Sequence, residues 1–281
     1  MPSDVLELKP FPPIDLAGEV NGLDFEAPLT QSQVDELRMA FRRYPVLCLR
    51  TDGLDPDRFL DVTRAFGAAQ AQVLRDYRRS DHPEISVISS EQFDTRGDGE
   101  RVVFGAAWHT DDSYLARPAV ATALYAHAVP QTGGDTLFAD CTAAYEALPE
   151  SEQAALDGVM VVHTYQSRRN LNRVPARSAE EEADTPPVSH PLVRTHPDTG
   201  RRALYLNPNR MDHVVGMSLE EGDALLDRLI AHATSDPFVY RHRWRPHDVL
   251  VWDNRCTMHK ASDDYGGERR EMHRVLIEGP Y

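Results

Sequence analysis

Two segments of the chain combine a capping-box pattern with apolar residues at helical spacing, which predicts amphipathic helices. The first pattern, Thr30 to Gln33, precedes apolar residues at 34, 37 and 41, and Pro45 ends the segment. The second, Ser218 to Glu221, precedes apolar residues at 225, 226, 229 and 230. Shorter helices are expected at about 56–66, 141–148 and 150–157.

Short apolar runs bounded by turn residues predict β-strands around these helices. The runs lie at 46–50, 84–88, 121–128, 137–139, 192–195, 203–207, 239–244, 249–252 and 273–278. The sequence has no internal repeat and no linker that would divide it. We therefore expect one domain, 1–281, that is mostly β with peripheral helices.

Two polar segments, 69–107 and 166–189, lack sustained apolar periodicity. We expect both to be loops that cover a substrate. The second is rich in Arg, Glu, Ala and Pro, and we expect it to be a mobile excursion.

Composition narrows the range of partners. A net charge of −15 disfavours binding to nucleic acid or to an anionic membrane. No stretch approaches the ~20 apolar residues of a membrane span, and the N-terminus lacks the pattern of a signal peptide. The three cysteines are isolated, which argues against a disulfide framework and a structural zinc site. We expect a soluble, cytoplasmic protein.

His109-Thr110-Asp111 and the distant His259 are the candidate metal ligands. In an extended segment, residues two apart project to one face, so His109 and Asp111 can reach one ion while Thr110 points away. Two histidines and one carboxylate on one face of a metal are typical of non-haem Fe(II) oxygenases. Taken alone the pattern is weak, because His-x-Asp pairs also arise by chance, as at His196-Pro197-Asp198, and His259 by itself is more simply an ordinary, partly buried histidine.

Four longer motifs surround these residues. They are Trp108-His109-Thr110-Asp111, Gly133-Gly134-Asp135-Thr136, Arg243-Trp244-Arg245-Pro246 and Trp252-Asp253-Asn254-Arg255-Cys256-Thr257-Met258-His259. With these motifs in this order, essentially the whole chain resembles the TauD/TfdA family of Fe(II)- and 2-oxoglutarate-dependent dioxygenases. The resemblance implies a double-stranded β-helix core (jelly-roll, cupin-like), with Fe(II), the cosubstrate 2-oxoglutarate, and O2.

The same resemblance assigns roles to the three ligands. It implies that His109, Asp111 and His259 bind the iron and form the catalytic centre. Related halogenases replace the carboxylate with a small residue, so Asp111 favours oxygen insertion or hydrogen abstraction over halogenation.

Arg270 and Arg274 lie four apart on a segment that we expect to be extended, so both face the same side. If that side is the interior, each guanidinium needs an anionic partner. The resemblance implies that Arg270 and Thr136 bind the distal carboxylate of 2-oxoglutarate, and that Arg274 contacts an anionic group of the prime substrate. The alternatives are an exposed basic edge and a plain strand threonine.

The expected substrate pocket departs from that of taurine enzymes. Where these present a histidine, a tyrosine and an asparagine, this chain has Gln72, Arg75 and Gly105. Together with Asp112 and Arg274, these are the candidate substrate-binding residues, although a solvated loop charge is the simpler interpretation of Arg75. The C-terminal motifs look closer to the branch of the family that acts on aryloxyalkanoates and similar carboxylates.

The predicted function is hydroxylation of a small anionic organic substrate, with C–X bond cleavage as one outcome and release of succinate and CO2. One alternative is the same chemistry on an amino-acid-like, nucleotide-like or carrier-bound biosynthetic intermediate. An alternative of a different class is a metal-binding barrel without redox chemistry, either a zinc hydrolase or a sensor of small anions. The family commonly forms dimers or tetramers, so we expect a homo-oligomer.

Overall fold

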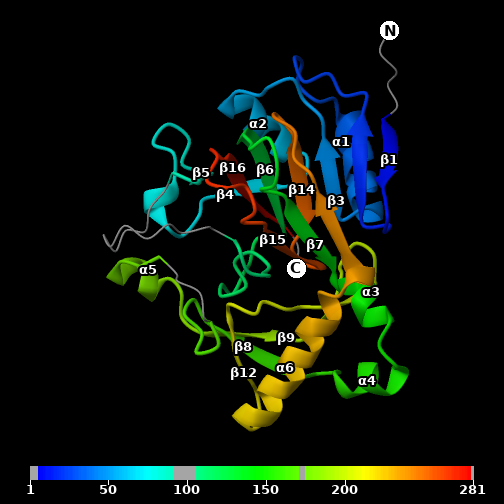
Figure 1. Cartoon of the computed structure of the whole chain (residues 1–281), viewed down its shortest axis with the longest axis vertical. Helices are drawn as coiled ribbons and strands as arrows, with labels where there is room; N and C mark the ends of the chain where they lie inside the picture. Colours follow the sequence, from blue (N-terminus) through cyan, green and yellow to red (C-terminus); the bar gives the residue numbers. More distant parts are fainter. Residues whose placement is uncertain (1–5, 92–104, 171–174, 280–281) are drawn as a thin grey trace.

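The structure, a computed structural model, describes residues 6–91, 105–170 and 175–279. Strands dominate it, and helices lie at its periphery, as predicted (Figure 1). The helices are α1 (Gln31–Arg43), α2 (Pro56–Thr63), α3 (Cys141–Glu146), α4 (Glu150–Ala155), α5 (Ala179–Ala183) and α6 (Leu219–Ala233), with 3-10 turns η1 (Arg75–Tyr77) and η2 (Asp236–Phe238).

The largest sheet has the strand order β1-β2-β3-β14-β6-β16-β4, and β5 also pairs with β16. Its pairs are antiparallel except β2 with β3. The strands are β1 (Glu7–Phe11), β2 (Ala17–Asn21), β3 (Val46–Leu49), β4 (Ala68–Gln70), β5 (Ile85–Ser89), β6 (Ala121–Ala128), β14 (Val249–Asp253) and β16 (Glu271–Glu278).

A second, antiparallel sheet faces the first and has the order β13-β7-β15. Its strands are β7 (Thr136–Asp140), β13 (Val239–His242) and β15 (Thr257–Ala261). The core between the two sheets contains Phe138 from β7, Trp252 from β14 and Met272 from β16. Two facing sheets with this core are consistent with the expected jelly roll.

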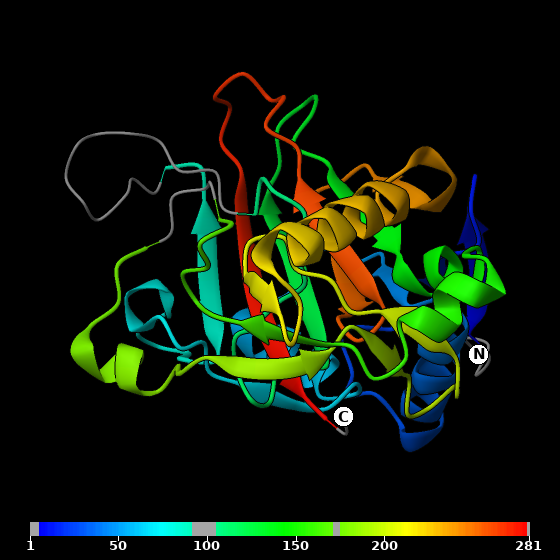
Figure 2. The same cartoon turned by 90° about the horizontal axis from the view of Figure 1, so that it is seen from below.

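Apolar clusters cover the outer faces of both sheets. On the large sheet, Leu37 of α1 and Phe59 of α2 pack with Val251 and Val275. On the other side, α6 packs against a smaller sheet with the order β12-β8-β9, and Figure 2 shows α6 lying across this part of the molecule. The remaining strands are β8 (Met160–His163), β9 (Val188–Pro191), β12 (Met211–Val214), and the hairpin β10 (Val193–Thr195) with β11 (Arg202–Leu204).

Both capping boxes form as predicted, at Thr30 before α1 and at Ser218 before α6. The predicted strand 121–128 matches β6 residue for residue, and the helix predicted at 56–66 ends earlier, at Thr63. The described part of 166–189 is not entirely irregular, because it holds α5 and the start of β9, and its role as a mobile segment that covers a substrate stays a prediction. Segment 69–107 contains β5 and η1, and its residues 92–104 lie outside the described part of the chain.

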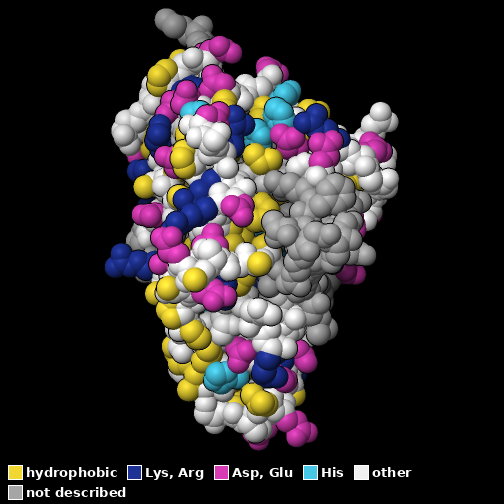
Figure 3. All heavy atoms as spheres, turned by 90° about the vertical axis from the view of Figure 1, so that its left-hand side faces the viewer, with side chains coloured by type: hydrophobic (Ala, Val, Ile, Leu, Met, Phe, Trp, Pro, Cys, Tyr) yellow, Lys and Arg dark blue, Asp and Glu magenta, His cyan; other side chains and the backbone are white. Residues whose placement is uncertain are grey.

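Among the described residues, no helix combines the length and the apolar composition needed to cross a lipid bilayer. On the face shown in Figure 3, acidic and basic side chains are interspersed with apolar ones.

Candidate active site

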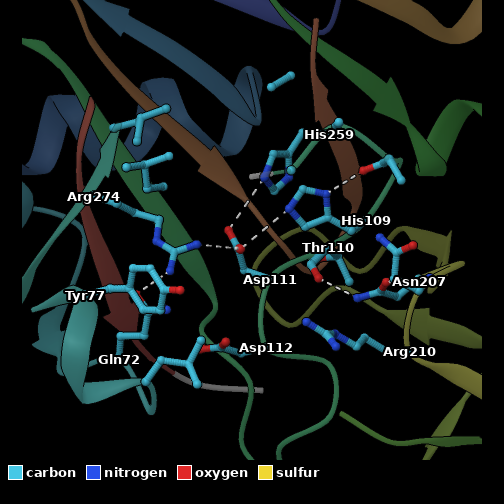
Figure 4. A pocket seen from close by; sticks show the side chains of 18 of the residues that line it. Gln72, Tyr77, His109, Thr110, Asp111, Asp112, Asn207, Arg210, His259 and Arg274 are labelled. Carbon is cyan, nitrogen blue, oxygen red and sulfur yellow. Dashed lines mark hydrogen bonds and ion pairs between the residues drawn. The ribbon is translucent and has the colours of Figure 1, made fainter. Parts of the chain in front are cut away.

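His109, Asp111 and His259, which we call the triad, meet beside the middle of β15, where His259 lies. His109 pairs with His259 through two backbone hydrogen bonds, of 3.0 and 2.8 Å. This isolated bridge brings the two imidazole ring centres to 4.1 Å. The Nε2 atoms of His109 and His259 lie 3.9 and 3.8 Å from the carboxylate oxygens of Asp111 (Figure 4). The three side chains therefore converge on a common point, as the sequence predicted.

A chain of hydrogen bonds fixes the triad carboxylate. Thr122 on β6 donates to Asp111 Oδ2 at 2.7 Å, and Asn254 Nδ2 donates to Thr122 Oγ1 at 2.8 Å. Trp252 Nε1 in turn donates to Asn254 Oδ1 at 3.1 Å. Thr110 points away from the site and donates to the Asn254 carbonyl. Trp252 and Asn254 therefore orient the carboxylate ligand through Thr122.

The triad has the protonation states that a divalent cation needs. Burial lowers the pKa of both imidazoles, so they are neutral at pH 7. Burial opposes ionisation of Asp111, yet its electrostatic interactions with His259 and Arg274 and the hydrogen bond from Thr122 lower the pKa of that carboxyl to about 2. His109 Nδ1 lies 2.8 Å from the Ala107 carbonyl, which as hydrogen-bond acceptor leaves the Nε2 lone pair free. The donor set fits Fe(II).

One end of the pocket that the triad lines also holds Arg270 and Thr136. Arg270 is buried, and its side chain makes a single hydrogen bond within the described structure, from Nε to the Gly134 carbonyl at 3.0 Å. Burial lowers the pKa of Arg270 to about 10. Thr136 Oγ1 accepts a hydrogen bond from Trp244 Nε1 at 3.0 Å, so its own proton can be donated to a ligand. This end is suited to a carboxylate.

Close packing around Arg270 requires glycine at position 134. Gly134 has φ +66°, and a Cβ atom there would lie 2.8 Å from Pro130 and 3.3 Å from the Arg270 side chain. The Gly-Gly motif therefore gives the arginine room to lie along the backbone.

The other end of the pocket carries the predicted substrate residues. Arg274 donates to Gln72 Oε1 at 2.5 Å and to Asp111 Oδ1 at 3.4 Å (Figure 4). Asp112 is in the left-handed region, with φ +54°, and it accepts a hydrogen bond from Tyr114 on one oxygen. Its other oxygen, Oδ2, is buried without a partner in the described structure, and burial together with the Asp111 charge raises the pKa of Asp112 to about 6.

Of two further predicted substrate residues, Arg75 lies outside the pocket and Gly105 lines it. Arg75 is half-exposed and is not among the residues that line the pocket; it forms two hydrogen bonds with Glu180, of 2.9 and 2.7 Å. Gly105 lines the pocket, but a Cβ there would lie 3.1 Å from His109 Cε1, and its φ is +74°. Gly105 therefore gives the imidazole space and has no side chain to bind a substrate.

Sequence reasoning missed Arg210, which lines the pocket from the turn before β12. Its guanidinium stacks on the rings of Tyr165 and Tyr114, at 4.5 and 5.1 Å from their centres, and donates to the Tyr165 carbonyl. The pocket thus has a third arginine, beside Arg270 and Arg274.

The family model described as "Taurine catabolism dioxygenase TauD, TfdA family" matches residues 7–276. The chain belongs to this family. A Cupriavidus pinatubonensis protein, alpha-ketoglutarate-dependent 2,4-dichlorophenoxyacetate dioxygenase, is 35% identical over 275 residues, and the match covers 95% of each chain. Pentalenolactone F synthase from Streptomyces arenae is 30% identical over 283 residues, covering 96% of this chain and 95% of the relative.

A solved structure gives the same result. The crystal structure of AAD-2 in complex with Mn(II) and N-oxalylglycine has a TM-score of 0.81 at 30% identity, and the match covers 99% of this chain and 98% of that chain. Members of the TauD/TfdA family with this similarity are 2-oxoglutarate-dependent dioxygenases, and so is this chain; its cofactors are Fe(II), 2-oxoglutarate and O2. This finding overturns the alternative hypothesis of a metal-binding barrel without redox chemistry.

Proposed function

We propose that this dioxygenase hydroxylates a small anionic organic substrate at a carbon held beside the triad. Where that carbon also bears oxygen, nitrogen or sulfur, the hydroxylated product would lose that group by C–X cleavage. The observation that carries the proposal is the pocket itself, which the triad lines together with a buried arginine, Arg270, and two further arginines, Arg210 and Arg274.

In this proposal His109, Asp111 and His259 hold the iron, and Arg270 and Thr136 hold the distal carboxylate of 2-oxoglutarate. Iron and 2-oxoglutarate supply the activation of O2, with oxidative decarboxylation to succinate and CO2. The protein supplies position. The bonds around Arg270 and Thr136 fix one end of the cosubstrate, and the bond from Thr122 fixes the carboxylate ligand.

Two arginines are available to the anionic group of the prime substrate. Arg274 already donates to Gln72 and to the triad carboxylate. A substrate anion would become a further acceptor for the Arg274 guanidinium. Arg210 is held by the two tyrosine rings and offers its remaining N–H groups to the pocket. A ring or chain of the substrate can pack on the same tyrosines, which suits an aryloxy acid or a comparable carboxylate.

Asp112 should give this pocket a preference for substrates that carry a hydrogen-bond donor. Its buried Oδ2 has no hydrogen-bond partner in the described structure, and a buried acceptor without a donor costs about 1–3 kcal/mol. A substrate with an amino or hydroxyl group would satisfy it. Asp112→Asn should therefore lower kcat/KM for the donor-bearing member of a matched substrate pair by roughly 10- to 100-fold, and leave the other member unchanged.

The test is a substrate panel scored for succinate release, with the product analysed for an oxygen atom derived from O2. It should span aryloxy acids, sulfonates, alkyl sulfates, N-substituted amino acids and nucleotides. Arg274→Met and Arg210→Met should raise KM for the substrate that is found, whereas Arg75→Met, a matched control outside the pocket, should not. Substrate-dependent succinate release that both pocket variants leave unchanged would contradict the proposed anion site.

A biosynthetic intermediate is the second candidate substrate class. The similarity to pentalenolactone F synthase supports it, because that relative is named for the synthesis of a product. The nucleotide and amino-acid arms of the panel separate this candidate from a free aryloxy acid.

A further inference from the structure

A second group of metal-ligating side chains lies on β6 and β16, outside the pocket. It consists of His127, Glu271 and His273. Side chains alternate along a strand, so Glu271 and His273 project away from the face that carries Arg270 and Arg274. Val275, which follows in the same alternation, packs in the cluster under α1 and α2. The group therefore lies on the outer face of the sheet, and the triad on the inner one.

An irregularity in the sheet brings the third side chain into the group. The register of β16 against β6 shifts between Glu271, which pairs with Ala128, and Met272, which pairs with Ala126. His127 is thus the extra residue of a bulge, and bulges re-aim side chains. Its ring stacks on that of His273, with centres 4.7 Å apart and planes 11° apart.

The ligand atoms have the spacing of a small metal site. Nε2 of His127 lies 3.6 Å from Glu271 Oε1, and Nε2 of His273 lies 3.2 Å from the same oxygen. Zinc binds nitrogen and oxygen at about 2.0–2.2 Å in a tetrahedron, which places its ligand atoms about 3.3 Å apart. Small rotations of the exposed His127 would complete this geometry.

His273 Nε2 and Glu271 Oε1 form a hydrogen bond of 3.2 Å with each other, which a bound metal would replace, and the surrounding charges do not bond to either atom in the described structure. Arg269 donates to Glu271 Oε2 at 2.8 Å. This hydrogen bond orients the carboxylate of Glu271 and leaves Oε1 facing the two histidines. Arg79 lies close enough to influence His273, but it forms its own ion pair with Asp81 at 2.7 Å. Burial lowers the pKa of His273, so its imidazole is neutral at pH 7 and able to bind a cation.

Two other groups of potential ligands among the described residues are occupied by arginines. Arg50 pairs with Asp248 beside Cys48 and His242, and Arg255 pairs with Asp253 beside His196 and Cys256. In both groups a guanidinium already compensates the carboxylate. No arginine bonds to the convergent oxygen of Glu271 in the described structure.

We propose that His127, Glu271 and His273 form a second, outer metal site that binds Zn²⁺ or a similar divalent transition metal through Nε2, Oε1 and Nε2, with water completing the tetrahedron. The proposal does not depend on the substrate or on 2-oxoglutarate. If both sites bind metal, the total metal content of the protein would overstate the occupancy of the triad.

The test is equilibrium dialysis of the metal-depleted full chain against zinc chloride, with bound zinc measured per chain. The wild type should bind two zinc ions, one at each site. His127→Asn and Glu271→Gln should each bind one, and so should His109→Ala, which disables the triad. His213→Asn is the matched control, because His213 lies 2.9 Å from Asp212 but belongs to none of the three-residue groups; it should bind two.

His127 is 46% exposed, so its substitution should leave the fold and succinate release unchanged; thermal unfolding in the presence of a chelator checks this for both outer variants. Retention of two zinc ions by His127→Asn and Glu271→Gln would overturn the proposal. So would a His109→Ala protein that binds no zinc, because the outer site would then be a hydrogen-bonded cluster only.

Discussion

Replacing Arg270 with methionine should stabilise the chain in the absence of 2-oxoglutarate and at the same time weaken its affinity for 2-oxoglutarate. The Arg270 side chain is 6% exposed, and burial lowers its pKa from 12.5 to about 10. This shift corresponds to a penalty of about 3 kcal/mol on the charged form. Because the folded-state pKa of a base is lowered, the penalty is complete at pH 7 and fades as the pH rises through 10. The lost hydrogen bond to Gly134 offsets about 1 kcal/mol of the gain.

Without 2-oxoglutarate, Arg270→Met should therefore be more stable than the wild type by about 2 kcal/mol at pH 7. With 2-oxoglutarate the order should reverse. Loss of a buried, charge-assisted pair costs about 3–5 kcal/mol, which corresponds to a roughly 10²- to 10⁴-fold weaker affinity for the cosubstrate.

The assay is anaerobic unfolding in urea with Mn(II), at several concentrations of 2-oxoglutarate. Arg274→Met is the control and should keep the affinity of the wild type for the cosubstrate, since Arg274 contacts Gln72 and Asp111 at the other end of the pocket. The reasoning is refuted if Arg270→Met is less stable than the wild type without 2-oxoglutarate and binds it within about threefold of the wild-type affinity.

Three further substitutions test the support around the site. Thr122→Val removes the hydrogen bond to Asp111 Oδ2, and metal affinity measured by dialysis should fall by about 10- to 100-fold; an unchanged affinity would show that this bond does not orient the ligand. Gly105 has φ +74°, and Gly105→Ala places a Cβ 3.1 Å from His109 Cε1, so succinate release should fall sharply while the fold is retained. Arg255→Met leaves the buried Asp253 without its main partner and should cost about 3–5 kcal/mol in urea unfolding at pH 7. Burial opposes its ionisation, but Arg255 and a histidine lower the pKa of Asp253 to about 2, so in the wild type this stabilisation is present above pH 4 and lost as the pH falls toward 2.

Local patterns predicted most elements of the fold but missed those whose signal is short. The capping boxes at Thr30 and Ser218 precede long apolar stripes, and both helices form. The same pattern at Ser178 and Glu181 precedes α5, but this helix has only five residues and no apolar stripe that periodicity could detect. Strand β15 was also missed, because its residues were interpreted as a ligand motif.

The triad could be predicted because its residues stand in long motifs, whereas the substrate end depends on tertiary contacts. Arg75 is close in sequence to Gln72, yet its side chain turns outward to Glu180. Arg210 enters the pocket because two tyrosines, distant in sequence, stack on its guanidinium. No local pattern distinguishes such an arginine from a solvated one.

The most direct test of the account is anaerobic addition of 2-oxoglutarate to the Fe(II)-loaded chain, followed by visible absorption. A weak charge-transfer band should appear for the wild type, require a much higher concentration of 2-oxoglutarate for Arg270→Met, and be absent for His109→Ala. No band from the wild type, or an equal band from His109→Ala, would contradict the assignment of the triad as the iron and 2-oxoglutarate site.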